Sequence, residues 1–444
     1  MFELVRESKV RIVLRGLEAH VTVAVSMQCT PAHFAFPIHI RCVAALCFTS
    51  MDREQIFQRL DAFKIETPSW GYSNTGTRFG KFLQPAAARN ISQRLADAGT
   101  VHRYTGCCPT VAVHVQWDFS VGVDATETAR VARQHGVKIR SINPTLFENQ
   151  LYKFGSVCSP DERASHHAHR HVLDSINIAR AVGSNLLSLW FADGTNYPGQ
   201  DDITSRKHRM HGALRQWHDA LPAGMTMLVE YKPFEPAFYH TDIADWGMAY
   251  VFAKDAGERA KVLVDTGHHL HGTNIEQIVA FLLDEEMLGG FHFNDRKYAD
   301  DDLTLGSIDP YAVFRIFHEI ENARELHGRD VSGIAYMIDQ SHNLKPKIEA
   351  MIQTAVTAQE LMAKALLVDR VALRDAQTQM DIVKAEECLR SAFNSDVKPM
   401  LAEWRRRRDI DPDPLQAYRA SGHEHKLASE RGDEPVTGST TSYV

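Results

Sequence analysis

Four apolar segments in the second half of the chain each end in a side chain that can bind a metal ion. The segments are MTMLVE, KVLVD, GGFH and IAYMID, and they end in Glu230, Asp265, His292 and Asp339. Such short runs are typical of buried strands, and a buried strand does not end in a bare carboxylate or imidazole unless that group has a partner. Three carboxylates and one imidazole favour Mn²⁺, Mg²⁺ or Co²⁺ over a structural zinc ion. We therefore expect these residues to form a first metal site.

A second candidate cluster consists of His268, Asp300 and Asp302, in the loops that follow two of these segments. Residues two apart on an extended chain point the same way, so the two aspartates can face one ion. With so few protein ligands, positions would remain for water and substrate, as a catalytic metal requires. A solvated acidic turn is the alternative. The neighbouring His269 and His271 are alternative ligands to His268.

Three further side chains are candidates for substrate contact. Lys232 follows Glu230 by two residues, and an ammonium there can stabilise negative charge that develops on a substrate oxygen. A charge-balancing ion pair is the alternative. His114, within AVHVQWD, could hydrogen-bond a substrate oxygen or assist ring opening, or it could be a core histidine. Trp190 ends an apolar run and could wall a sugar pocket, with core packing as the alternative.

These side chains need a fold that gathers the ends of several strands. Segments with strand character alternate with helical patterns, which predicts an α/β fold of the (β/α)₈ barrel type. In such a barrel the carboxyl ends of the strands meet at one mouth, where active sites lie. The strand candidates are 64–70, 111–117, 137–142, 185–191, 226–231, 261–266, 289–294 and 334–340. Residues 71–110, between the first two, are poorly periodic and are expected to be a long loop.

The remaining segments flank this barrel, which we place at residues 51–345. Residues 1–50 have no clear helical or strand period and are treated as an N-terminal extension of undefined structure. A helical pattern follows the last strand, and residues 346–428 are assigned to a C-terminal helical extension. The tail 429–444 is polar and rich in Pro, Gly, Ser and Thr, so it is expected to be disordered.

Composition excludes several classes of protein. A net charge of −7 argues against a nucleic-acid surface, which needs a basic face. No run of about 18 apolar residues lacks polar breaks, so no membrane span is expected. The seven cysteines are odd in number and show no CxxC spacing, which fits reduced thiols in a cytoplasmic protein.

Several long motifs of this chain together resemble the bacterial L-rhamnose isomerase family of broad sugar specificity, whose members are xylose isomerase-like (β/α)₈ barrels. The motifs are PSWG, GTRF, HVQWD, FADGTNYPGQ, EYKPFEPAFY, VDTGHH, GGFHFNDRKYADDD and MIDQSHN, in that order. The resemblance implies a metal-dependent aldose–ketose isomerase that acts on a monosaccharide, with L-rhamnose as the expected substrate, and forms a homotetramer. It also implies Mn²⁺ as the cofactor, with Co²⁺, Mg²⁺ or Zn²⁺ as substitutes.

The resemblance further implies a role for each matching residue. The structural ion would be held by Glu230, Asp265, His292 and Asp339, and the catalytic ion by His268, Asp300 and Asp302. The substrate site would be lined by His114, Trp190, Lys232 and His268. Phe79, in GTRF, would lie on a loop that reaches into the pocket of a neighbouring subunit. The departure from the family is residues 1–50, which do not look like its helical N-terminus.

The chemical path and rival functions stay open at this stage. A hydride could shift directly, or a base could lift a proton to give an enediol, the base being Asp339 or a metal-bound hydroxide held by Asp302. A rival enzyme would be another metal-dependent barrel, such as a sugar epimerase or a phosphodiesterase, although the latter would want a basic groove. An inactive sugar-binding barrel would show a broken ligand set, whereas all the matching ligand positions are filled.

Overall fold

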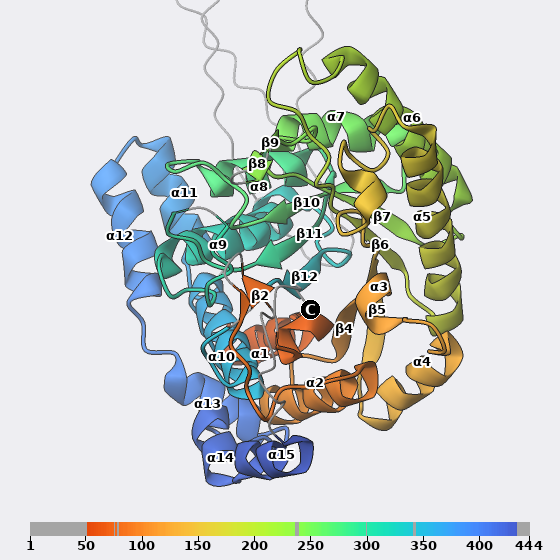
Figure 1. Cartoon of the computed structure of the whole chain (residues 1–444). Helices are drawn as coiled ribbons and strands as arrows, with labels where there is room; N and C mark the ends of the chain where they lie inside the picture. The colour runs from red at the N-terminus through yellow and green to blue at the C-terminus, as the bar shows by residue number, and fades with distance from the viewer. Residues whose placement is uncertain are drawn as a thin grey trace, which may run out of the picture. The chain divides into compact units, whose positions relative to one another are not determined.

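A closed barrel of eight parallel strands organises the computed structural model, which describes residues 51–432 except 75, 78–79, 236–238, 299 and 341–342. Each predicted strand segment overlaps one strand, four of which extend one residue beyond the prediction, and the barrel fold is confirmed. Strands adjacent in the barrel are adjacent in the chain, and β1 closes the ring between β12 and β4 (Figure 1). The strands are β1 (Ile65–Pro68), β4 (Thr110–His114), β5 (Lys138–Asn143), β6 (Leu186–Leu189), β7 (Thr226–Glu230), β10 (Ala260–Asp265), β11 (Leu288–Phe293) and β12 (Ala335–Ile338). Two short hairpins, β2–β3 (Gly76–Thr77, Gly80–Lys81) and β8–β9 (Phe234–Glu235, Tyr239–His240), lie in the loops after β1 and β7.

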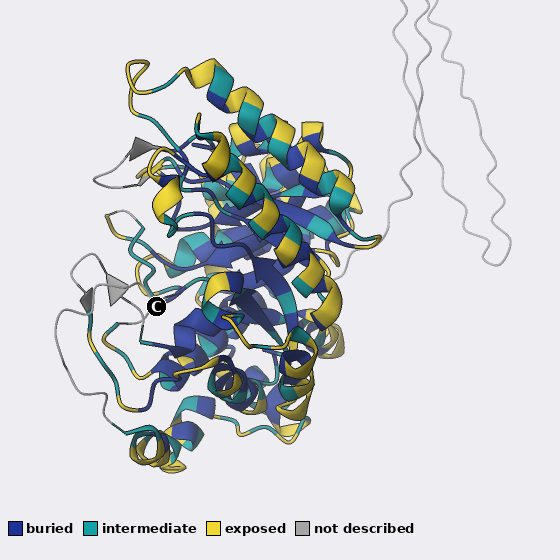
Figure 2. Ribbon diagram, turned by 45° about the vertical axis from the view of Figure 1, so that its right-hand side comes forward, coloured by how far each residue is buried: buried dark blue, intermediate teal, exposed yellow. Residues whose placement is uncertain are grey.

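A helix follows every barrel strand. The strands are buried, and the helices turn their exposed faces away from them (Figure 2). The helices are α2 (Ile91–Thr105), α4 (Ala125–Gln134), α5 (Glu162–Val182), α6 (Ile203–Ala220), α7 (Trp246–Ala256), α8 (Ile275–Asp284), α9 (Pro310–His327) and α10 (Lys347–Leu366). The helix α1 (Arg53–Ala62) precedes β1, and the single turn α3 (Val115–Asp118) follows β4.

Most of these helices begin at an Asp or Asn whose side chain accepts a hydrogen bond from a backbone N–H of the first turn. That bond satisfies a donor that has no partner inside the helix, and it fixes the residue where each helix begins. The capping residues of α2 and α4–α9 are Asn90, Asp124, Asp161, Asp202, Asp245, Asn274 and Asp309.

The expectation of a long loop over residues 71–110 is wrong, because α2 occupies its second half. The buried face of α2 includes Arg94, Asp97 and Thr100. These polar residues interrupt the apolar period by which a helix is recognised in sequence. Gly99 lets α2 approach the chain at His135, since a Cβ at residue 99 would lie 2.3 Å from the His135 carbonyl oxygen.

The predicted C-terminal extension begins with a helix of the barrel. α10 follows β12 and packs against α9 and α2, so it completes the ring of helices. Five shorter helices then follow in the described chain: α11 (Arg370–Thr378), α12 (Ile382–Phe393), α13 (Lys398–Arg406), α14 (Pro414–Ala420) and α15 (His423–Arg431). α15 runs past the predicted start of the disordered tail, and Arg431 forms an ion pair with Asp97 of α2 at 2.7 Å. Residues 1–50 and 433–444 lie outside the described residues.

Apolar side chains fill the inside of the barrel beneath its carboxyl end. The interior is tightly packed at Gly289 of β11, where there is no room for a side chain. A Cβ on Gly289 would lie 2.4 Å from Cδ2 of Leu228, so a larger residue would displace the interior packing. The interior cluster consists of Leu186, Leu228, Leu263, Ala335 and Met337.

A buried arginine joins the loops that follow β5, β6 and β7. Arg206 of α6 is 2% exposed, and its guanidinium donates to both carboxylate oxygens of Asp242, at 3.0 and 2.7 Å, and to Asp201 at 3.0 Å. Asp193 holds the loop after β5 by accepting the backbone N–H of Ser156 at 2.7 Å. The backbone N–H of Asp242 donates to the Asp193 carbonyl at 2.8 Å, which ties the loops after β6 and β7.

We predict that Arg206→Met destabilises the fold because it leaves the carboxylate of Asp242 without its counter-charge, whereas Asp201 keeps Arg209. Removing one partner of a buried ion pair costs about 3–5 kcal/mol. The free energy of unfolding from urea titrations should fall by that amount. Arg209→Met is the matched control: Arg209 pairs with the same Asp201 but is 29% exposed, so its loss should cost about 1 kcal/mol or less. Equal losses in the two variants would contradict the assignment.

Candidate metal centre

The first predicted cluster assembles at the carboxyl ends of four adjacent strands. Glu230 ends β7, Asp265 ends β10, His292 lies in β11 and Asp339 directly follows β12. The Nδ1 atom of His292 lies 3.2 Å from Oε1 of Glu230, 3.9 Å from Oδ2 of Asp265 and 3.7 Å from Oδ2 of Asp339. The barrel register explains the convergence, because Asp265 pairs with His292 across β10 and β11.

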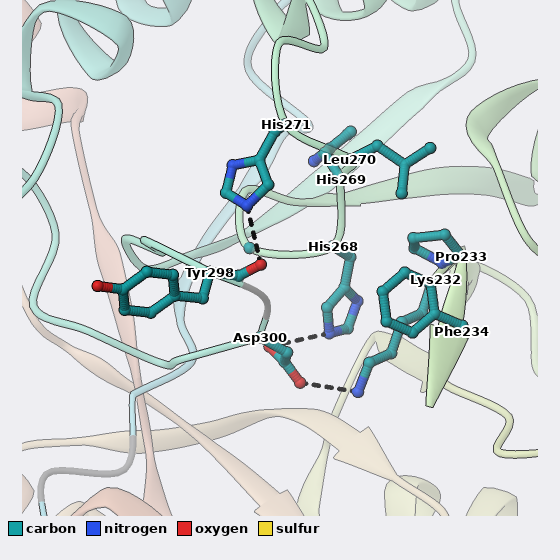
Figure 3. Close-up of a pocket in the computed structure, with 10 residues that line it drawn as sticks. Lys232, Pro233, Phe234, His268, His269, Leu270, His271, Tyr298 and Asp300 are labelled. Carbon is teal, nitrogen blue, oxygen red and sulfur yellow. Dashed lines mark hydrogen bonds and ion pairs between the residues drawn. The ribbon is translucent and has the colours of Figure 1, made fainter. Parts of the chain in front are cut away.

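The second cluster adjoins the first. Nε2 of His268 lies 3.4 Å from Oδ1 of Asp300 and 3.9 Å from Oδ2 of Asp265. Lys232 donates to Oδ2 of Asp300 at 2.8 Å, so the aspartate lies between a lysine and a histidine (Figure 3). Donor atoms of Glu230, Asp265 and His292 lie within 4.8 Å of one another, and so do those of Asp265, His268 and Asp300. Asp265 therefore belongs to both groups.

Asp302 reaches this region by a backbone conformation that the sequence did not suggest. We expected an extended segment in which Asp300 and Asp302 point the same way, but Asp302 has a φ of 47°, in the left-handed region. The intervening Asp301 accepts the backbone N–H groups of Lys297 and Tyr298, at 2.6 and 2.8 Å, and so closes the loop as a turn. The turn, and not an extended chain, orients the carboxylate of Asp302.

The pKa values of the two clusters show that their charged groups act strongly on one another. Burial alone would raise the pKa of Glu230, but His292 and His268 outweigh it and lower that pKa to about 2. Burial, opposed only in part by His268, raises the pKa of Asp265 to about 7. Burial would lower the pKa of His292, yet Glu230, Asp339 and Asp265 raise it to about 9. Burial and the neighbouring carboxylates raise the pKa of Asp302 well above its usual range.

This donor set fits a divalent cation. Its members are carboxylates and imidazoles, the ligands that Mn²⁺ and related ions accept, with no thiolate among the described members. Oδ1 of Asp300 is buried, forms no hydrogen bond with a described residue and has only the imidazole of His268 facing it at 3.4 Å, as two ligands of one ion would face each other. Burial, with the repulsion of neighbouring carboxylates added to it, raises the pKa values of Asp265, Asp302 and Asp339, and a bound cation would offset both effects.

His269 and His271 do not compete for this centre in the structure. Nε2 of His269 forms a 2.6 Å hydrogen bond with the Tyr231 hydroxyl. Nε2 of His271 donates to the carbonyl oxygen of Tyr298 at 2.9 Å (Figure 3). Both imidazoles therefore hold loops in place, and His268 is the member of the HHLH run that faces the carboxylates.

A small cavity of about 60 Å³ borders the second cluster. Its walls come from the loops after β7, β10 and β11, including Lys232, Phe234, His268, Tyr298 and Asp300. The loops thus leave space beside the candidate second metal site, next to Asp300 and Lys232 (Figure 3).

Aromatic rings gather on the other side of the mouth around His114. The His114 ring lies 4.1 Å from the ring of Trp117 and 5.8 Å from that of Phe147, measured between centroids. Trp190 packs on Phe147 at 5.0 Å and has Lys232 Nζ 5.2 Å from its ring centre. Burial lowers the pKa of His114 to about 3, so its imidazole is neutral. Nδ1 of His114 lies 3.3 Å from the Thr145 hydroxyl.

The structure adds residues that the sequence did not single out. Trp70, just after β1, donates its indole N–H to Oδ1 of Asp339 at 3.0 Å and stacks edge-on against His114 at 4.8 Å. Asn294 donates to Oδ1 of Asp265 at 3.0 Å, as does the backbone N–H of Gly267 at 2.7 Å. Trp70 lies in PSWG and Asn294 in GGFHFND, so the motifs contained them, but no residue type marked them as partners of a ligand.

Two other points complete the account of the predicted site. Phe79 lies outside the described residues, as does His342. Cys158, Asp193 and Asp242 also bring donor atoms together, but backbone N–H groups and the guanidinium of Arg206 already satisfy the two carboxylates. That group is a structural network. No helix of the described chain has the length and hydropathy needed to cross a membrane.

The chain shares sequence with characterised families along most of its length. Residues 111–326 match the model of the xylose isomerase-like TIM barrel. A probable sugar isomerase of Mesorhizobium japonicum is 39% identical over 396 residues, which cover 88% of this chain and 91% of that protein. A probable sugar isomerase of Rhizobium meliloti is 39% identical over 388 residues, covering 86% and 89%.

Among solved structures, the D-psicose 3-epimerase of Clostridium cellulolyticum H10 with D-tagatose aligns with a TM-score of 0.47 at 12% identity. That alignment covers 69% of this chain and 98% of the epimerase chain. The extent and identity of the sequence matches, together with the eight-stranded barrel, identify the family of this chain. It belongs to the xylose isomerase-like TIM barrel family.

Proposed function

We propose that this protein is a metal-dependent aldose–ketose isomerase whose preferred substrate is L-rhamnose, which it converts to L-rhamnulose. The observation that carries the proposal is the pair of donor groups that share Asp265 at the barrel mouth, next to Lys232 and an aromatic wall. The two relatives named as probable sugar isomerases support the isomerase class. The choice of L-rhamnose rests on the motif resemblance alone.

In this proposal the centre holds two divalent ions, with Mn²⁺ as the native metal. Glu230, Asp265, His292 and Asp339 hold the first, and His268, Asp300 and Asp302 hold the second. When bound, the ions would polarise the carbonyl and hydroxyl oxygens at C1 and C2 of an open-chain sugar. The cavity beside Asp300 and His268 leaves room for an oxygen ligand that the protein does not supply.

The chain's own residues supply the proton and charge chemistry. Lys232, paired with Asp300 at 2.8 Å, places a positive charge where a substrate oxygen becomes negative. Asp302 and Asp339 are the candidate sources of the base for an enediol path, because both are carboxylates at the barrel mouth beside the proposed ions. A hydride path would need no such base.

The aromatic side of the mouth would bind and open the sugar. Trp190 and Trp117 offer apolar faces to the ring or to the methyl group of a deoxy sugar. His114 is neutral, so one ring nitrogen can accept a hydrogen bond from a sugar hydroxyl and the other can donate one. We also propose, from the resemblance, a homotetramer in which Phe79 contacts the pocket of a neighbouring subunit.

The proposal is tested with metal-free protein to which Mn²⁺ is returned. With L-rhamnose in a panel of aldoses and ketoses, we expect Mn²⁺-dependent formation of the ketose, detected by chromatography, with the highest kcat/KM for L-rhamnose. Conversion of one ketose into another without aldose would indicate an epimerase. Turnover that persists after complete removal of metal would contradict the metal-dependent mechanism.

We predict that Asp265→Asn lowers metal content and the metal-dependent part of thermal stability together. Asn keeps the volume and hydrogen bonds of the side chain but removes the charge that two ions would share. Because binding energy at such a site is coupled to folding, the rise in Tm that Mn²⁺ gives the wild type should shrink by more than half. His271→Gln, in the same loop, is the control. Full metal occupancy and an unchanged Tm shift in Asp265→Asn would contradict the first site.

We predict that Asp302→Asn retains the fold and one bound ion but loses turnover by about 10³-fold, the order expected for removing a catalytic acid–base group. Asp301→Asn is the matched control, because its amide oxygen can still accept the two backbone N–H groups that Asp301 binds. We expect its kcat to fall by less than about tenfold. Similar kcat values in the two variants would show that this acidic turn is only a solvated surface.

A further inference from the structure

The second ring nitrogen of His292 raises a question that the proposed metal site does not answer. Nδ1 faces the carboxylates of Glu230, Asp265 and Asp339. An imidazole that binds an ion through Nδ1 carries its proton on Nε2, and this N–H then needs an acceptor. Nε2 of His292 is buried and has no hydrogen-bond partner in the described part of the chain.

A buried acceptor without a partner lies in the same barrel. Glu66 of β1 is fully buried, and neither of its carboxylate oxygens forms a hydrogen bond with any described residue. Leaving a buried carboxylate unsatisfied is expensive, so such a group needs a compensating donor. The groups near enough to lower the pKa of this carboxyl are Arg140, Ser141, His292 and Thr110.

The strand register brings Glu66 and His292 to one level of the barrel. Glu66 pairs with Met337 across β1 and β12, and His292 pairs with the same Met337 across β12 and β11. Paired residues on neighbouring parallel strands point to the same face. Met337 belongs to the interior cluster, so Glu66 and His292 both point inward. Their backbones are two strands apart, about 10 Å, a separation that two long side chains pointing inward from opposite sides can bridge.

We propose that Glu66 is a positioning residue that accepts the Nε2–H of His292, directly or through a single bound water, once Nδ1 holds the first ion. The proposal rests on the proposed function, since it presupposes an ion at that site. Glu66 would fix the tautomer and the orientation of the ring, and its negative charge would make Nδ1 a better donor. It contacts neither the substrate nor the ion.

The rival explanation is that Glu66 only balances the charge of Arg140, which lies half-buried on β5. In that case, changing either residue would alter stability, and neither would alter metal affinity. The two explanations therefore separate on the Kd for Mn²⁺, which a purely structural pair does not influence.

The experiment titrates Mn²⁺ into full-length protein freed of metal by a chelator, with calorimetry giving Kd and melting giving Tm. We expect the Kd of the first site to rise about tenfold in Glu66→Gln, whose amide oxygen is a weaker acceptor, and about 100-fold in Glu66→Met, the range seen when such partners of a ligand are lost. Ser188→Ala, which removes another buried polar atom of the described barrel that lacks a hydrogen bond, should leave Kd unchanged, as should Arg140→Met.

A double-variant comparison makes the assignment specific to His292. In a His292→Ala background, Glu66→Met should change Kd by less than threefold, because the N–H that it serves is gone. If Glu66→Met fails to fold alone, Glu66→Met with Arg140→Met removes both charges and should still show the weaker Kd.

The outcomes also separate this inference from the proposed function. Wild-type protein that binds no Mn²⁺ would overturn both. Wild-type protein that binds Mn²⁺, with Glu66 variants that bind it equally well, would overturn only the role of Glu66. If Glu66→Met raises Kd by the same factor in the wild-type and His292→Ala backgrounds, Glu66 acts on the site by a route other than His292.

Discussion

The repulsion among the carboxylates at the barrel mouth is the constraint on which the rest of this structure depends. Strand ends of the core hold Glu230, Asp265 and Asp339 at the mouth, and the loop after β11 adds Asp300 and Asp302, near enough for their charges to act on Asp265 and Asp339. In a low-dielectric setting, like charges at such distances disfavour the ionised form. Two histidines and a lysine offset part of that charge. The barrel therefore stores an electrostatic preference for a cation at its mouth.

Holding these groups in place requires rigid support outside the cluster itself. The amide of Asn294 donates to both oxygens of Asp265, at 3.0 and 3.3 Å, and the backbone N–H of Gly267 donates to Oδ1, so the orientation of this carboxylate is set from outside the cluster. Asp301 shapes the turn that carries Asp302, and Arg206 joins three loops around the mouth. These partners make few contacts with the reacting region, yet they determine which way each donor atom points. Preorganisation of this kind lets a site act on charge without rearranging.

The sequence predicted the parts of this molecule that are governed by strong local patterns. Short apolar runs located all eight strands, and the residues at their ends located the first cluster, because a buried strand end restricts which polar groups are acceptable. α2 was missed because its inward face carries Arg94 and Asp97, whose partners Asp118 and Arg431 are distant in sequence. The left-handed turn at Asp302 was missed for a different, local reason. Its geometry depends on hydrogen bonds within the loop, and spacing alone does not encode them.

The hydrogen bond from Trp70 to Asp339 crosses the seam where the first and last strands of the barrel meet. Trp70 comes from the beginning of the barrel and Asp339 from its end, so the two meet only when β1 pairs with β12. A ribosome has therefore synthesised nearly the whole barrel before the last carboxylate of the first cluster can be fixed. During synthesis the chain carries Glu230, Asp265 and His292 without that carboxylate. The first cluster is therefore completed only when the barrel closes.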